Sequence, residues 1–182
     1  MIMVGDALAK LEQDRRTAAG SRVELADSPV GMVVKAGAPV PDISTVPALR
    51  QTLLKAHSMA YSDSASGRYV ESQLFRKLGI DGQSTIKRTG LSVSRWRLKW
   101  QREIRPRLSA GERASAGPGV TFVGKLPDDI QYITRFAGAV TQKADHPEQG
   151  KALLAFLSSP QAASVITATG LTPVNAPRDT AR

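Results

Sequence analysis

The 182-residue sequence contains no cysteine and only two histidines, His57 and His146. Without cysteine the chain cannot form a disulfide bond, a thiolate metal site or a thiol nucleophile. Two isolated histidines are too few for a histidine-rich metal site, so no metal ion and no cofactor is predicted. His57 falls at the end of a predicted helix, where a cation stabilises the helix dipole and a structural role is expected.

The motifs of common enzymes are also missing. The sequence contains no nucleophile elbow, phosphate-binding loop, zinc-protease motif or dinucleotide fingerprint. A carboxylate pair, Asp128 and Asp129, follows Pro127, but nothing nearby in the sequence suggests a metal site or an acid/base partner, and we interpret the pair as part of a turn. These absences predict a protein that is not an enzyme.

Hydrophobic runs are short. No stretch approaches the roughly 18 consecutive apolar residues that a membrane-spanning helix requires. The first residues do not show the charged and apolar regions of a signal peptide. As written, the chain is therefore expected to stay in the cytoplasm.

Positive charge is abundant but concentrated in one segment. Lys and Arg number 25 against 16 Asp and Glu, which gives a net charge of +9. Between Lys87 and Arg113 there are nine basic and two acidic residues, so this segment carries +7 and the rest of the chain +2. Trp96, Trp100 and Ile104 lie four residues apart within it and would form the apolar stripe of a basic helix. The segment alone is typical of a nucleic-acid-binding module or of a helix on an anionic membrane surface.

Apolar spacing and turn residues predict alternating helices and strands. The expected helices span residues 7–17, 45–57, 69–78, 145–158 and 160–169. The expected strands span residues 30–35, 58–61, 119–124 and 132–140. This alternation indicates an α/β fold.

A serine-rich turn, Ser62–Gly67, lies between a predicted strand and a predicted helix and is called the serine turn below. Hydroxyl groups and backbone N–H groups at the start of a helix can bind an anion, because the positive end of the helix dipole points there. The candidate ligand-binding residues are Ser62, Ser64, Ser66 and Gly67. The alternative is that one serine only caps the helix and the rest is a solvated turn.

Four stretches together resemble a known family by their order and spacing. The first is Ile2-Met-Val-Gly-Asp-Ala-Leu8. The second runs from Gly20 through Ser28-Pro-Val-Gly-Met-Val-Val-Lys-Ala-Gly-Ala-Pro39 and is followed by Pro41-Asp-Ile-Ser44. The third and fourth are Ala60-Tyr-Ser-Asp-Ser-Ala-Ser-Gly67 and Phe156-Leu-Ser-Ser-Pro-Gln-Ala-Ala163. The family is that of the substrate-binding proteins of molybdate-type ABC transporters, among the class II periplasmic binding proteins.

This resemblance implies an α/β fold with two lobes that close around a small, molybdate-like oxyanion. It implies a periplasmic monomer that delivers its ligand to an ABC transporter permease, with no nucleic acid as partner. The serine turn would face the ligand, and Tyr132 is a weaker candidate contact. The expected parts are residues 1–35 as a remnant of the first lobe and a crossing strand, 36–131 as the second lobe, 132–176 as the return to the first lobe, and 177–182 as a tail.

The sequence departs from the family pattern in two places. Its start matches a point inside the family's first lobe, so an incomplete two-lobe architecture with impaired binding is expected. Residues from about 90 to 117 do not resemble the family, although the resemblance continues on both sides. A codon choice that reads Ile104–Ser115 one nucleotide later permits an apolar and then amphipathic peptide like that of the family. We therefore hypothesise a locally shifted reading frame there, and the rival interpretation remains the basic nucleic-acid-binding segment.

Overall fold

The computed structural model describes residues 1–82, 87–91, 107–110 and 119–175. The chain forms two compact units. Unit 1 comprises Met1–Ser28 and Thr134–Arg182, and unit 2 comprises Pro29–Ile133. The chain therefore passes from unit 1 to unit 2 within one long strand and returns at the start of another. The family resemblance implies boundaries after residues 35 and 131.

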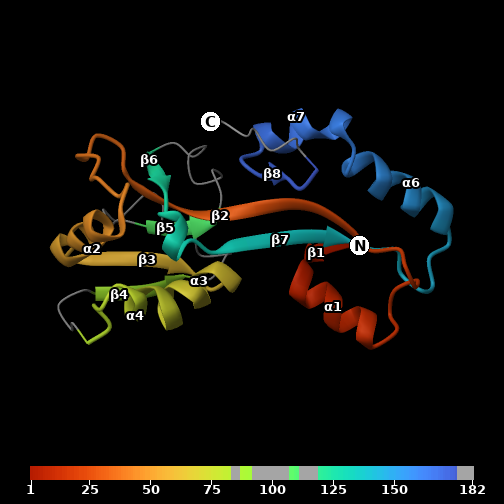
Figure 1. Cartoon of the computed structure of the whole chain (residues 1–182), viewed down its shortest axis with the longest axis horizontal. Helices are drawn as coiled ribbons and strands as arrows, with labels where there is room; N and C mark the ends of the chain where they lie inside the picture. The colour runs from red at the N-terminus through yellow and green to blue at the C-terminus, as the bar shows by residue number, and fades with distance from the viewer. Residues whose placement is uncertain (83–86, 92–106, 111–118, 176–182) are drawn as a thin grey trace. The chain divides into compact units, whose positions relative to one another are not determined.

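The sheet of unit 1 is built from strands at both ends of the sequence. Strand β1 (Ile2–Val4) pairs antiparallel with β7 (Ile133–Gly138), in the register that sets Ile2 opposite Gly138. Strand β7 in turn lies beside β2 (Val23–Lys35), as Figure 1 shows. The short strand β8 (Thr172–Pro173) pairs with the part of β2 that belongs to unit 1. None of these pairings joins strands that are neighbours in the sequence.

Three helices complete unit 1: α1 (Gly5–Gln13), α6 (Pro147–Leu157) and α7 (Pro160–Ala168). Both C-terminal helices carry proline in their first turn, where the missing N–H costs no helical hydrogen bond. The buried residues form two small clusters, Leu8 with Ala137 and Ala139, and Leu25 with Val140 and Leu154.

Unit 2 contains a mixed sheet. The second half of β2 pairs antiparallel with β5 (Arg107–Ala110) and with β6 (Val120–Lys125). Strand β3 (Ser58–Ser62) runs parallel to both β4 (Lys87–Leu91) and β5. Parallel neighbours need a crossover connection, and the helical segment after β3 is part of the crossover that leads to β4.

The helices of unit 2 follow local sequence signals. Helix α2 (Val46–Lys55) is capped by Thr45, whose Oγ1 accepts a hydrogen bond of 3.2 Å from the N–H of Ala48. The segment after β3 is helical from residue 65 to residue 77. It consists of α3 (Ala65–Tyr69), a π-helical turn η1 (Val70–Leu74) and α4 (Phe75–Lys77). A single 3₁₀ turn, η3 (Asp128–Ile130), precedes β7 and carries the predicted turn after Pro127.

One hydrophobic core unites the elements of unit 2. The sheet, α2 and the helical segment after β3 supply most of its fully buried side chains, and η3 closes it with Ile130. The largest of them are Phe75, Met32, Leu49, Leu53, Met59, Leu74 and Ile80. This core fixes the end of β3 and the start of α3, so the serine turn lies on a packed scaffold.

The predicted helices and central strands are all present where they fall on described residues, with shifted ends. The helix expected over 69–78 begins earlier, at Ala65, because Ser64 adopts extended dihedrals and the chain turns helical directly after it. Strand β2 begins seven residues before its predicted start at Val30, although Pro29 has no backbone N–H to donate to a neighbouring strand. Within the part of the chain that the structure describes, no helix is long and apolar enough to cross a membrane.

Candidate functional site

The serine turn joins the end of β3 to the start of α3. Ser62 is the last residue of β3, and Ser64 occupies the cap position immediately before Ala65. Ser62 is 8% exposed and Ser66 is 2% exposed. Strand and helix both belong to unit 2, so the structure brings the four predicted residues of this turn together.

The three serine hydroxyls form a chain. Ser62 Oγ lies 2.6 Å from Ser64 Oγ, and Ser64 Oγ lies 3.0 Å from Ser66 Oγ. Each hydroxyl can donate one hydrogen and accept others, so the chain can reorient its protons toward a bound group. It presents polarity without a formal charge.

The amides of the first turn add further donors. The first helical hydrogen bond runs from the N–H of Arg68 to the carbonyl of Ser64, at 3.0 Å. The N–H groups of Ala65, Ser66 and Gly67 precede it and have no acceptor within the helix. Ser64 makes no side-chain capping bond. The interpretation that a serine simply caps this helix through its side chain is therefore wrong for Ser64.

Gly67 is required by a close approach of two backbone segments. A Cβ atom at this position would overlap the carbonyl oxygen of Ser62 and lie 2.5 Å from its carbonyl carbon. Real Cβ atoms essentially never approach other heavy atoms within 3.0 Å. Glycine thus lets α3 start directly against the last carbonyl group of β3, which holds the three serines together.

Tyr132, the weaker predicted contact, reaches the same helix through another aromatic residue. Its ring stacks on the ring of Tyr69, with centroids 4.9 Å apart and planes inclined by 16°. Tyr69 is buried and lies two residues after Gly67, at the end of α3. The structure therefore places Tyr132 beside the helix that carries the serine turn.

Tyr69 and Gln131 match no motif in the sequence and were not predicted as site residues. The Tyr69 hydroxyl donates a hydrogen bond of 2.6 Å to the carbonyl of Ile130, and the Gln131 side chain binds the backbone of Val30. These partners lie 61 and 101 residues away in the sequence. No local motif could have indicated such contacts.

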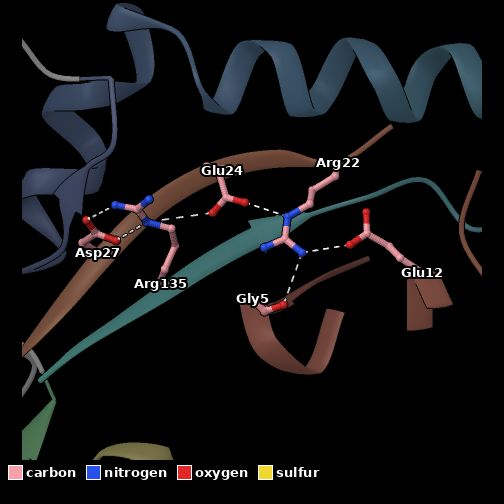
Figure 2. Close-up of polar contacts among 6 residues, drawn as sticks. All are labelled: Gly5, Glu12, Arg22, Glu24, Asp27 and Arg135. Atoms are coloured by element: carbon pink, nitrogen blue, oxygen red, sulfur yellow. Dashed lines mark hydrogen bonds and ion pairs between the residues drawn. The ribbon is translucent and has the colours of Figure 1, made fainter. Parts of the chain in front are cut away.

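Unit 1 contains a separate group of charged side chains, drawn in Figure 2. Arg22 binds Glu24 at 2.6 Å and Glu12 at 2.8 Å, and these hydrogen bonds raise the pKa of its guanidinium group. Arg135 on β7 reaches across to β2 and binds both carboxylate oxygens of Asp27 at 2.8 Å, which raises its pKa as well.

In this group both guanidinium groups face carboxylates of the same unit. The Oε2 atom of Glu24 is buried without a hydrogen bond and lies 3.9 Å from Arg135 Nε. The ion pairs of this group connect β2 with β7 and α1. Because Glu12, Glu24 and Asp27 already neutralise both cations, the group offers little attraction to an anion.

Other features of the described residues do not form a chemical site. A cavity of about 380 Å³ in unit 1 is lined mainly by apolar side chains of β1, α6 and the segment after β7. The described residues contain no group of three or more side chains that could hold a metal ion. The basic residues from Arg95 to Arg105, and with them the predicted basic helix, lie outside the described residues.

Comparisons with known proteins agree on one type of fold. The family described as "Bacterial extracellular solute-binding protein" matches residues 1–172. A protein of Pseudomonas sp. named aconitate isomerase is 40% identical over 97% of this chain, which spans 68% of its length.

Two solved structures are similar as well. One, from Clostridium difficile, is described as the substrate-binding domain of a molybdenum ABC transporter. Its TM-score is 0.74 at 13% identity, and the match covers 95% of this chain and 76% of the Clostridium difficile chain. The periplasmic molybdate-binding protein of Azotobacter vinelandii has a TM-score of 0.67 at 18% identity, over 94% and 76%. These likenesses confirm the predicted α/β fold of the periplasmic-binding-protein type, with part of the lobes represented.

Proposed function

Because this chain belongs to the family of bacterial extracellular solute-binding proteins, we propose that it binds a small anion at the serine turn. The observation that carries the proposal is the part-buried chain of hydroxyls from Ser62 to Ser66 beside the first amides of α3, which have no acceptor within the helix. Neutral donors of this kind match an anion without adding a full countercharge. Asp63 is the only carboxylate within the turn, and it is exposed.

The ligand class follows from the same chemistry. Hydroxyl and amide donors suit a compact, fully deprotonated group, either a tetrahedral oxyanion such as molybdate or the carboxylates of an organic acid. The two structural neighbours that carry molybdenum or molybdate in their descriptions support the oxyanion. The relative at 40% identity is named for a tricarboxylate and supports the organic acid.

The role we propose is capture and delivery without chemical change. The bound anion would be passed to an ABC transporter permease outside the cytoplasm, by a monomeric binding protein. The family's description supports this location and role. Binding needs only donors in fixed positions, and the serine turn supplies them, while its one carboxylate, Asp63, is exposed.

A second candidate function is isomerisation of aconitate, favoured by the name of the relative from Pseudomonas sp.. Moving the double bond of aconitate requires a group that removes a proton from carbon and returns one. The two functions therefore differ in whether the anion leaves the protein unchanged.

One set of measurements separates these functions. The full chain is titrated calorimetrically with molybdate, tungstate, sulfate and cis- and trans-aconitate, up to millimolar concentration because weak binding is expected. Saturable binding that is lost in Ser62→Ala/Ser66→Ala supports the proposed site, and no saturable binding of any of them refutes it. Proton NMR of each aconitate isomer with the protein then tests catalysis, since conversion to the other isomer would contradict a purely binding role.

A further inference from the structure

We propose that Tyr69 is a positioning residue that fixes the serine turn to the segment Ile130–Tyr132, where the chain leaves unit 2. The proposal deepens the function proposed above and rests on it for its consequence in binding. Its structural basis is a set of contacts within unit 2 that neither the family pattern nor the sequence indicated.

Tyr69 contacts this segment in two ways. Its hydroxyl donates a hydrogen bond of 2.6 Å to the carbonyl of Ile130, and its ring stacks on Tyr132. Lys77 Nζ also lies 5.2 Å from the centre of the Tyr69 ring and 3.4 Å from its hydroxyl. The Tyr69 residue is 4% exposed, so the hydrogen bond is sheltered from water.

The segment that receives Tyr69 is itself held by Gln131. The Oε1 atom of Gln131 accepts hydrogen bonds from the N–H groups of Val30, at 2.6 Å, and Tyr132, at 2.9 Å. Its Nε2 atom donates to the carbonyls of Val30 and Leu126, each at 3.0 Å. One amide side chain thus joins β2, the end of β6 and the residue before β7 at the place where both connecting strands enter or leave unit 2.

These contacts transmit a constraint to the serine turn through a short helix. Tyr69 is the last residue of α3, and the helix contains Ser66 and Gly67 only three and two residues before it. The turn that follows, Val70–Leu74, is π-helical and departs from regular α-helical hydrogen bonding. A continuous α-helix on the C-terminal side therefore does not set the register of α3. The Tyr69 hydrogen bond adds a directional restraint to the packing of the core, and we infer that it limits the rotation of α3 and, with it, the direction of the first-turn amides.

A matched pair of variants tests this role in the full chain. Tyr69→Phe removes the hydroxyl and keeps the ring stack. Ser72→Ala removes a hydroxyl that donates at 2.6 Å to the carbonyl of Arg68, within the exposed face of the same helical segment. Both variants lose a hydrogen bond of the same length, but only the first loses the connection to Ile130.

The first measurement needs no ligand. Hydrogen exchange is followed at the amides of Arg68 and Val70, which donate to the carbonyls of Ser64 and Ser66, and at Leu49, which donates to Thr45 in α2. In Tyr69→Phe the first two amides should exchange about three- to tenfold faster, the effect expected from one sheltered hydrogen bond, while Leu49 stays unchanged. Equal exchange in Tyr69→Phe and the wild type, or an equal increase at Leu49, would overturn the proposal.

The second measurement uses molybdate and trans-aconitate as probes. If the wild type binds either, Tyr69→Phe should weaken the affinity by about three- to tenfold, because a smaller fraction of the protein holds the competent turn. Ser72→Ala should leave it unchanged, and equal affinity in Tyr69→Phe and the wild type would refute the positioning role. If the wild type binds neither probe, the function proposed above is at fault, and the exchange measurement still decides on Tyr69.

Discussion

Replacing Gly67 with alanine tests whether the serine turn depends on the contact between β3 and α3. The added Cβ would overlap the carbonyl oxygen of Ser62, and a backbone atom cannot move aside as a side chain can. Relief requires α3 to retreat from β3, which strains the first helical hydrogen bond from Arg68 to Ser64. Steric overpacking in a core costs about 1–3 kcal/mol, and overlap with backbone belongs at the upper end.

Part of this cost is offset, since alanine favours a helix over glycine by up to about 1 kcal/mol. The expected net loss for Gly67→Ala is therefore about 2 kcal/mol or more in the free energy of unfolding. Urea unfolding followed by circular dichroism measures it, provided that the slope of the transition is the same in both proteins.

The matched control is Gly82→Ala. Among the described residues nothing lies within 4 Å of a Cβ built at Gly82, so the free energy of unfolding should change by less than about 0.5 kcal/mol. If Gly67→Ala is as stable as Gly82→Ala, the close approach between β3 and α3 is not a feature of the folded protein. The serine turn would then not depend on Gly67.

Two further predictions concern charged groups. A double-mutant cycle with Asp27→Asn and Arg135→Gln should give a coupling of about 0.5–1 kcal/mol in the free energy of unfolding, because the ion pair is bidentate but Arg135 is half-exposed. This coupling should decrease at high salt, and a coupling that does not depend on salt would contradict the assignment. Hydrogen bonds from Ser44 lower the pKa of Asp42, the one from its backbone N–H more than the one from its hydroxyl. The ionised Asp42 therefore contributes to stability above the ordinary carboxyl pKa, and this contribution is lost as the pH falls through the lowered value. Ser44→Ala should move this pKa only part of the way back in an NMR titration, and no upward shift would refute the assignment.

Local signals in the sequence were sufficient for the regular elements. Thr45 and Pro47 mark the start of α2, and the proline at residue 160 marks the start of α7. These signals act through contacts within one helical turn, so they can be interpreted without knowledge of the fold. The serine turn was found in the same way, as a cluster of small donors between a strand and a helix.

The short strands were missed for the opposite reason. Strand β1 contains three residues, and its register is set by β7, more than 130 positions along the chain. Strand β8 has two residues and pairs with Ala26 and Asp27 of β2. Segments of this length carry no periodic pattern of their own, so only their partners make them strands.

The sequence by itself was sufficient for membership among the solute-binding proteins, for the alternation of helices and strands, and for the four small residues proposed as the candidate site. Only the tertiary structure decided how those residues are held. Gly67 is needed because α3 starts against the Ser62 carbonyl, and Tyr69 matters because Ile130 lies within reach of its hydroxyl. The physical reason is that propensity and capping depend on neighbours in the chain, whereas close packing and sheltered hydrogen bonds depend on which distant segments the fold brings together.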